Sequence, residues 1–514
     1  MRIGIDFGTT RLVVAAADRG NYPLVHFETP DGGVCDWFPP VVAVKGAERR
    51  YGWDALAVEE DLSGWVVLRS LKRCLREAGP HTELGVADQK LPVRLLLAEM
   101  MTALRSQLLE HSNLGAVAGE RLEAVLGVPA NANSNQRFLT EEAANRAGFT
   151  VVGLMNEPSA AAIEFAYRNS AERMTRAGTG LLVYDLGGGT FDVSLVTMGE
   201  AEHTIEASDG IPNLGGDDFD EILAALAMEV AGKEQDSLRA AERYRLLEEC
   251  REKKETLNPN TRKVTVDLER VRAGWELVTI PVDAYYERCR PLIERTRVVV
   301  DDLLARQTTR TLDTLYVTGG GSELPPVARI LREHFGRKVR RSGYMRSASA
   351  VGLAIRAGMA ADGLRDQFNE NFGMWREANH GGTIVFDLIF PRGVALPAPG
   401  QPPLRRERVY QPAHNIGHFR YLECSRLDER GQPAGEITNW DQIWFPFEQR
   451  LQGRDDLALI PVHGMTANNS IHAHEEYTCD ASGNLRVRIS AEPSGYAREY
   501  AIGQLAGEEA ALIK

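Results

Sequence analysis

The chain has 514 residues, of which 43% are hydrophobic and 25% charged, as in ordinary soluble globular proteins, and this length suggests about three folding units. The net charge of −13 argues against a general nucleic-acid-binding protein. The six cysteines show no metal-ligand spacing, no apolar run reaches the roughly 18–20 residues of a membrane span, and the first strand follows Met1 directly, so we expect a soluble cytoplasmic protein.

The N-terminal motif IGIDFGTT, residues 3–10, is an apolar strand that ends at Asp6 and runs into a turn formed by Gly8, Thr9 and Thr10. A second apolar strand follows, so the motif predicts a hairpin. Backbone amides in a glycine turn can converge on a phosphate, and a carboxylate beside it favours Mg²⁺. One such turn, taken alone, is equally consistent with a hairpin that binds nothing.

Several helices and strands follow before the middle of the chain. Lys72 lies in a short mixed-charge segment and, taken alone, indicates a solvated surface lysine. Residues 122–129 predict a strand that ends in proline, and residues 134–148 predict a helix. Glu157 opens another helix in NEPSAAA, where it either favours the helix N-terminus electrostatically or faces a cleft.

The central stretch, residues 181–196, repeats the N-terminal pattern as two apolar strands around DLGGGTFD, with Asp185 before the glycine turn and Asp192 after it. Two such hairpins suggest a duplicated architecture with two phosphate turns facing one another across a cleft. Further glycine turns occur at 214–220, before a helix, and at 319–321, after a strand. No glycine turn is followed by Gly-Lys-Ser/Thr, so the P-loop does not fit. The dinucleotide fingerprint does not fit the central turn, because Gly187 and Gly189 lack a third glycine at Asp192 and a strand follows instead of a helix.

Beyond residue 361 the composition of the sequence changes. Residues 362–383 are polar and rich in asparagine and glycine, which is typical of a linker. Short strands broken by turns follow over 384–503, and residues 485–489 alternate strictly between apolar and charged, which predicts an antiparallel β domain. Residues 504–514 form a short tail.

These motifs, in this order and spacing, resemble the nucleotide-binding domain of the seventy-kilodalton heat-shock (DnaK-type) chaperones. The resemblance covers residues 1–361 and implies an α/β fold, with an actin-like, ribonuclease H-like duplicated ATPase domain. It is carried by IGIDFGTT, by VPA at 128–130 with SNQR at 134–137, by NEPSAAA, by DLGGGTFD, by LGGDDFD and by GGGS at 319–322.

The resemblance also implies roles for individual residues, with ATP or ADP and Mg²⁺ as the ligands. Asp6 and Asp185 would hold Mg²⁺ through water, with Asp192 as a further candidate, and Pro129 and Arg137 would relay the nucleotide state. The implied catalytic residues are Lys72, Glu157, Asp185 and Thr190, and the implied nucleotide-binding residues are Gly8, Thr9, Thr10, Gly187, Gly188, Gly189, Gly215, Gly216, Lys254, Gly319, Gly320 and Gly321.

Departures from the family pattern gather in the adenosine pocket. Lys254 fits the pattern, but Arg251 stands where the family has a glutamate and Glu255 where it has an arginine. Glu323 replaces an arginine that packs on adenine. The catalytic centre is therefore expected to be intact, whereas nucleotide affinity and the preferred base stay open.

Residues 384–503 resemble the family's β-sandwich substrate domain, most clearly over 475–491, and the helical lid that should follow has no counterpart. The resemblance thus implies a chaperone-like protein that couples slow ATP hydrolysis to binding of a protein or peptide client. A J-domain co-chaperone and a nucleotide-exchange factor are implied by the family, and neither nucleic acid nor membrane is expected. The alternatives are a non-catalytic nucleotide-binding adaptor or scaffold and, less favoured, a small-molecule kinase of the same superfamily.

Overall fold

The structure is a computed structural model that describes residues 1–502 apart from the gaps given at the end of this paragraph. The chain forms two compact units, the first made of Met1–Cys74, Glu83–Asn131 and Glu141–Leu364 and the second of Leu75–Thr82, Ala132–Thr140 and Arg365–Lys514. The predicted tail and part of the predicted linker lie outside the described residues. The gaps are 61–63, 87, 117–118, 131, 170–178, 199–203, 307–311, 360–366, 369, 379–382, 398–399 and 466–469.

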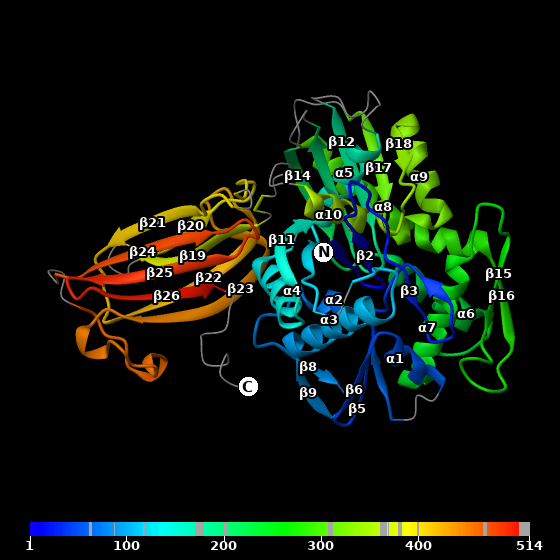
Figure 1. Cartoon of the computed structure of the whole chain (residues 1–514), viewed down its shortest axis with the longest axis horizontal. Coiled ribbons are helices and arrows are strands. Elements are labelled where there is room, and N and C mark those ends of the chain that lie inside the picture. Colours follow the sequence, from blue (N-terminus) through cyan, green and yellow to red (C-terminus); the bar gives the residue numbers. More distant parts are fainter. Residues whose placement is uncertain are drawn as a thin grey trace. The chain divides into compact units, whose positions relative to one another are not determined.

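Two larger sheets of the first unit follow one plan (Figure 1). In each, a hairpin supplies two antiparallel strands, and two further strands continue the sheet in parallel, in the orders β11-β10-β1-β2 and β18-β17-β12-β13, with β14 added to the second. This repetition agrees with the predicted duplication. The strands are β1 (Arg2–Phe7), β2 (Leu12–Ala16), β10 (Glu123–Val128), β11 (Thr150–Asn156), β12 (Gly180–Leu186), β13 (Phe191–Thr197), β14 (Thr204–Ile211), β17 (Thr314–Thr318) and β18 (Val339–Arg341).

Helices α5 (Glu157–Arg168) and α10 (Ala348–Gly358) lie between these two sheets, as Figure 1 shows. One apolar core joins both helices to both sheets. The helices cross closely because small residues meet there: a Cβ on Gly352 would lie 1.8 Å from the carbonyl oxygen of Ala160. The alanines of NEPSAAA therefore serve packing, and this packing fixes the N-terminus of α5, where Glu157 lies.

The remaining helices and small sheets of the first unit surround this centre. A second apolar core beneath β12, β13 and β17 is covered by α6, α7, α8 and α9. The helices are α1 (Trp53–Leu56), α2 (Leu71–Cys74), α3 (Val93–Glu110), α6 (Gly216–Val230), α7 (Ala240–Glu255), α8 (Val282–Ala305) and α9 (Pro325–Phe335). Helix α4 (Ser134–Arg146) is divided between the two units, and its residues up to Thr140 belong to the second. The small sheets contain β3 (Phe27–Glu28), β4 (Val34–Cys35), β5 (Val42–Lys45), β6 (Glu48–Tyr51), β7 (Val66–Leu68), β8 (Glu83–Val86), β9 (Gln89–Pro92), β15 (Lys263–Asp267) and β16 (Leu277–Pro281).

The C-terminal part of the second unit contains two four-stranded antiparallel sheets, ordered β20-β19-β22-β23 and β21-β24-β25-β26. Side chains of both sheets, including Phe372, Phe445, Tyr477 and Val487, form one apolar core. The alternation predicted for residues 485–489 is observed, with the apolar side chains buried and the two arginines exposed. The strands are β19 (Asn371–Ala378), β20 (Thr383–Phe390), β21 (Leu404–Tyr410), β22 (Ile416–Leu427), β23 (Pro433–Pro446), β24 (His472–Cys479), β25 (Leu485–Glu492) and β26 (Tyr496–Ile502).

Strand β19 falls inside the span that the sequence suggests is a linker. Its polar appearance is misleading because Phe372 and Met374 point into the core while Arg376 is neutralised there. Arg376 donates to Asp387 (2.6 Å) and to Glu475 (3.0 Å), and Glu475 is fully buried. The strand-rich region therefore begins before residue 384.

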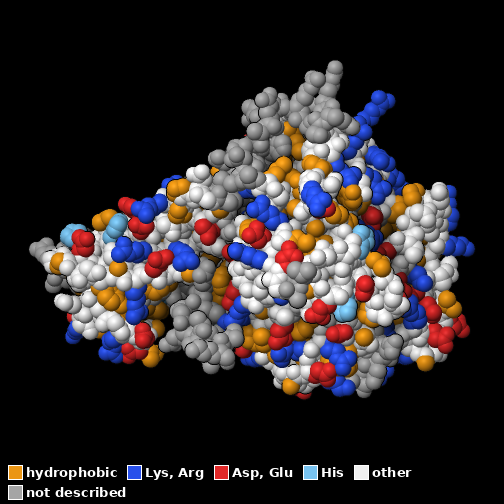
Figure 2. Space-filling model, in the orientation of Figure 1, with side chains coloured by type: hydrophobic (Ala, Val, Ile, Leu, Met, Phe, Trp, Pro, Cys, Tyr) orange, Lys and Arg blue, Asp and Glu red, His pale blue; other side chains and the backbone are white. Residues whose placement is uncertain are grey.

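Charged side chains of both signs are interspersed over the face of the molecule in Figure 2, rather than gathered by sign. In the described part of the chain, every helix is too short or too polar to span a bilayer.

Candidate nucleotide site

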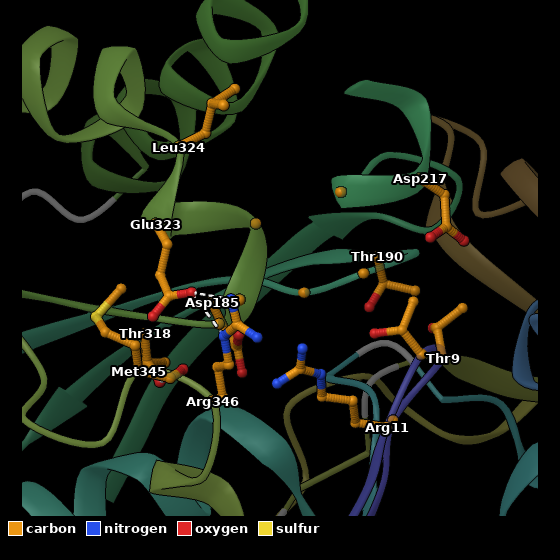
Figure 3. Close-up of a pocket in the computed structure, with 18 of the residues that line it drawn as sticks. Thr9, Arg11, Asp185, Thr190, Asp217, Thr318, Glu323, Leu324, Met345 and Arg346 are labelled. Atoms are coloured by element: carbon orange, nitrogen blue, oxygen red, sulfur yellow. Dashed lines mark hydrogen bonds and ion pairs between the residues drawn. The ribbon is translucent and has the colours of Figure 1, made fainter. Parts of the chain in front are cut away.

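A pocket in the first unit is lined by the glycine turns that the sequence singles out (Figure 3). Thr9 and Thr190 face each other on one side of the view, while Glu323 and Arg346 lie on the other. The pocket brings together most of the predicted residues. It is lined by Asp6, Gly8, Thr9, Thr10, Lys72, Glu157, Asp185, Gly187, Gly188, Thr190, Gly216, Lys254, Gly319, Gly320 and Gly321, whereas Gly189, Gly215, Asp192, Pro129 and Arg137 are not among its lining residues.

The two predicted hairpin turns, one between β1 and β2 and one between β12 and β13, meet at one end of the pocket. A Cβ on Gly188 would lie 2.5 Å from the side chain of Thr10, so only glycine lets the turns approach this closely. The second turn is closed by the Gly187 N–H, which donates to the Thr190 carbonyl oxygen at 2.9 Å. The predicted facing of the two turns is therefore observed.

The other two glycine clusters pack onto the central turn. The N–H of Gly216, at the start of α6, donates to the carbonyl oxygen of Gly187 (2.9 Å). A Cβ on Gly215 would lie 2.5 Å from the carbonyl oxygen of Gly188. The third cluster is held by the Gly319 N–H, which donates to Met345 O at 2.7 Å. Glycine turns from separate segments thus surround one end of the cavity, where the absence of side chains lets an anion approach the backbone closely.

Buried carboxylates lie beside these turns. Burial, followed by the charge of Glu157, raises the pKa of Asp6 to about 7 and that of Asp192 to about 6. Burial, Glu157, Asp6 and Asp192 raise the pKa of Asp185 well above its ordinary value. Asp185 and Asp192 are also partners in the register of the β12–β13 hairpin. Because these buried carboxylates repel one another when they are ionised, a cation would be bound favourably between them.

Lys72 lies among these carboxylates and is not the solvated surface lysine that its local sequence suggests. Its side chain is 5% exposed, and its ammonium group donates to Glu157. Burial opposes its charge, yet Glu157 and Asp6 raise its pKa above the ordinary value. The short helix α2 is held in place by Ser70, which donates to Asp217 at 2.7 Å, and by Arg73, which pairs with Asp218 at 2.8 Å.

The predicted relay residues lie away from the pocket lining. Pro129 follows β10, and the next residue, Ala130, donates its N–H to Asp192 at 3.0 Å within the first unit. Arg137, in α4, belongs to the second unit and donates there to the carbonyl oxygen of Ser482 at 3.2 Å. Asp192 therefore lies behind the pocket wall, with its carboxylate bound by a backbone amide.

We call the part of the pocket lined by Asp6, Thr10, Lys72, Glu157, Asp185 and Gly188 the glycine end. Among the described residues, no group of three or more His, Cys, Asp or Glu side chains is arranged as a direct metal site. Asp6 and Asp185 nevertheless fit a cation held through water, because both carboxylates are buried and because burial and then neighbouring carboxylates raise their pKa values.

The opposite part of the pocket, which we call the arginine end, is lined by Arg11, Glu255, Glu323 and Arg346. Glu255 and Glu323 are two of the positions where the sequence departs from the family pattern. Sequence reasoning missed Arg11 and Arg346. Arg11 could have been found, since it directly follows the Thr9-Thr10 turn, whereas Arg346 lies in a loop without a local signal.

The other departing position, Arg251, is engaged by acidic residues of α6 and α7. Its guanidinium lies 3.4 Å from Asp217 and 3.3 Å from Glu248. Lys254, the position that fits the family, pairs with Asp220 at 2.7 Å and donates to the Gly216 carbonyl oxygen at 2.7 Å. Lys254 thus holds the glycine turn at the start of α6.

A family model described as Hsp70 protein matches residues 78–367, more than half of the chain. The chain therefore belongs to the Hsp70 family, and it is a mixed α/β protein with the actin-like ATPase domain of that family. This confirms the predicted family and that part of the predicted fold class.

Two curated relatives are chaperones. The chain is 30% identical over 384 residues to a "Chaperone protein HscA homolog" of Burkholderia multivorans and 29% identical over 385 residues to "Chaperone protein DnaK" of Thermotoga petrophila. Each match covers 70% of this chain and 58% or 59% of the relative, respectively. The chain thus spans less than two thirds of the length of these relatives.

Proposed function

We propose that this protein is a DnaK-type chaperone-like ATPase, which binds ATP or ADP with Mg²⁺ and hydrolyses ATP slowly. One observation carries the proposal: paired glycine turns, buried carboxylates and Lys72 meet at the glycine end of the pocket. Phosphoryl transfer needs little covalent work from a protein, so positioning and charge neutralisation account for most of the catalysis. The glycine end offers both.

The proposed roles follow from the chemistry of each side chain. The Gly188 amide and the Thr9 and Thr10 turn would bind the phosphates, beside Gly187, which closes its turn. Asp6 and Asp185 would hold Mg²⁺ through water, with Asp192 behind them. Bound there, Mg²⁺ would neutralise charge on the phosphate oxygens. These assignments extend to the predicted nucleotide-binding glycines and to Lys254, which supports the turn at Gly216.

Lys72, Glu157 and Thr190 would act on the attacking water and the terminal phosphate. The Lys72 ammonium carries a positive charge in a buried position, where charge on the transferring group is stabilised most strongly. Glu157 orients Lys72 by accepting its hydrogen bond. The Thr190 hydroxyl lines the pocket beside the glycine turn, where it can donate to the water or to a phosphate oxygen.

For the second unit, we propose a β-sandwich that binds a protein or peptide client. The two antiparallel sheets with one common core support this architecture. Pro129 and Arg137 would relay the nucleotide state, and a J-domain co-chaperone and a nucleotide-exchange factor would regulate the cycle in the cytoplasm. Client binding is tested by comparing the affinity for an unfolded reporter protein in the presence of Mg-ATP and of Mg-ADP, which we expect to differ.

The ATPase proposal is tested by single-turnover hydrolysis of Mg-ATP together with equilibrium binding of ATP, ADP and GTP. Thr190→Ala should bind ATP but hydrolyse it about 10²- to 10³-fold more slowly, as expected when one transition-state donor is removed. Lys72→Met should also lose hydrolysis. Lys253→Met is the matched control, because Lys253 neighbours the site in sequence but pairs with Glu249 outside the pocket lining.

A non-catalytic adaptor is the second candidate, and the paired charges at the arginine end favour it. An adaptor predicts that the wild type binds no nucleotide, or binds ATP without any turnover that Thr190→Ala could reduce. Either result would overturn the ATPase proposal.

A further inference from the structure

The arginine end is a connected set of ion pairs made by segments far apart in the sequence. Arg346 donates through Nε to Glu323 Oε2 (2.6 Å), and its Nη1 lies 3.0 Å from Glu255 Oε2. The same Glu255 oxygen accepts from Arg11 at 2.7 Å. These four side chains come from the turn after β1, the end of α7, the third glycine cluster and the loop before α10.

These contacts hold the guanidinium of Arg346 in one orientation. Glu323 receives Nε and Nη2, and Glu255 receives Nη1, so all three nitrogens of the guanidinium have carboxylate partners. The edge of the group is thereby satisfied by the protein itself. Its flat face needs no hydrogen bond, and a planar guanidinium stacks well on flat π systems.

The side chain of Arg346 reaches the cavity. The stem of Arg346 runs past Gly320, where even a Cβ would lie 3.6 Å from Arg346 Cγ, and the side chain lines the pocket while remaining 28% exposed. Figure 3 shows Arg346 and Arg11 pointing into the same space, with Glu323 above Arg346 and joined to it by dashed lines. Arg11 itself already stacks on Trp37, with its Cζ 4.9 Å from the ring centroid.

The position of the Arg346 guanidinium relative to the glycine end indicates which part of a ligand it would contact. If phosphates bind at the glycine end, the base of the same nucleotide has to lie toward the other end of the pocket. The described lining of the pocket includes the apolar residue Met345, which directly precedes Arg346. A flat, partly apolar ring at this end would meet the guanidinium face beside Met345.

We propose that Arg346 is the base-contacting residue of this pocket, on whose guanidinium face the purine stacks, with Glu323 and Glu255 as its positioning residues. This inference rests on the proposed nucleotide site and adds a residue that determines the affinity for the base. Because stacking reads the face of a ring and not its edge, Arg346 favours purines in general and does not separate adenine from guanine.

The test measures equilibrium binding of two ligands with Mg²⁺: ATP, and inorganic tripolyphosphate, which has the phosphates but no base. Arg346→Ala should lower ATP affinity roughly 5- to 100-fold, the range for losing one stacked base, and should leave tripolyphosphate affinity unchanged. GTP should lose affinity by a similar factor. Arg346→Lys, which keeps the charge but not the plane, should lose most of the same affinity.

The control is Arg243→Ala, which removes an arginine that pairs with Glu221 outside the pocket lining and should change neither ligand. Retained tripolyphosphate binding by Arg346→Ala also shows that the variant is folded. Unchanged ATP affinity, or an equal loss for ATP and tripolyphosphate, would overturn the stacking role while leaving the ATPase proposal standing. A wild type that binds neither ligand would overturn the ATPase proposal and this inference with it.

Discussion

The two ends of the pocket hold their charges in opposite ways. At the glycine end, Asp6, Glu157 and Asp185 crowd around one cation, Lys72, and the pKa values of both aspartates are raised, first by burial and then by neighbouring carboxylates. At the arginine end, Glu255 has two arginine partners. Burial by itself would raise the pKa of Glu255, but Arg11 and Arg346 hold it below the ordinary value.

This difference shows what each end lacks. The glycine end has more negative charge than its own lysine can neutralise, so it gains most from a cation supplied with a ligand. The arginine end is neutralised by its own side chains and offers a ligand a face rather than a charge. A region with excess negative charge and a charge-balanced region in one cavity are consistent with a ligand whose two ends differ, such as a nucleotide with its metal.

The largest expected effect comes from closing the glycine end sterically. In Gly215→Ala, the added methyl group would lie 2.5 Å from the backbone of Gly188, which cannot move without displacing the turn. We expect ATP affinity to fall at least about 100-fold, or about 2.7 kcal/mol. Isothermal titration with Mg-ATP measures this.

The neighbouring substitution Gly216→Ala is the matched control. The atom nearest to the added methyl group would be Lys254 Nζ at 3.3 Å, which is the end of a flexible side chain and can shift. We expect less than a tenth of the loss in affinity seen for Gly215→Ala. Similar losses in the two variants would show that the close approach to Gly188 is not what the site requires.

A smaller effect should appear in the pH dependence of stability. In the folded protein the pKa of Asp6 is raised to about 7 and that of Asp192 to about 6, whereas in the unfolded chain both lie near 3.9. Without Mg²⁺, the folded state therefore binds more protons than the unfolded state between these values. The free energy of unfolding should fall as the pH rises through this window, by on the order of 2 kcal/mol between about pH 5 and about pH 8.

Urea unfolding at both pH values, with EDTA and with Mg²⁺, measures this dependence. A bound cation stabilises the ionised carboxylates, so Mg²⁺ should reduce the fall. Asp6→Asn removes one of the titrating groups and should flatten the profile recorded in EDTA. If neither Mg²⁺ nor this substitution changed the pH profile of the unfolding free energy, the proposed titration of the carboxylates at the glycine end would be wrong.

The smallest effect is expected at the arginine end. In Glu255→Gln, Arg346 keeps Glu323, and the side chains of this cluster are 22–36% exposed, so the unfolding free energy should fall by about 1 kcal/mol or less. High salt should shrink the difference further. The control is Glu252→Gln on the same helix. Glu252 is 55% exposed and pairs with Arg270, which is 52% exposed, so this substitution should change stability still less. A loss of several kcal/mol would mean that the cluster behaves as a buried network.

The sequence by itself determined the parts of this protein that depend on local spacing. Strand–Asp–glycine turns, the glycine before α6 and the alternation in β25 each fix a backbone path within a few residues, and they predicted the paired turns and most of the pocket lining. The family followed from the same motifs and is confirmed.

Only the tertiary structure decided which charges meet. Lys72 reads locally as a surface lysine, yet folding buries it against Glu157, 85 residues away along the chain. Arg346 lies 91 residues from Glu255, and Arg376 lies 99 residues from Glu475, so no local pattern links either pair. Ion pairs of this kind depend on distances between segments that only the packed fold sets, whereas turns and strands depend on the backbone preferences of neighbouring residues.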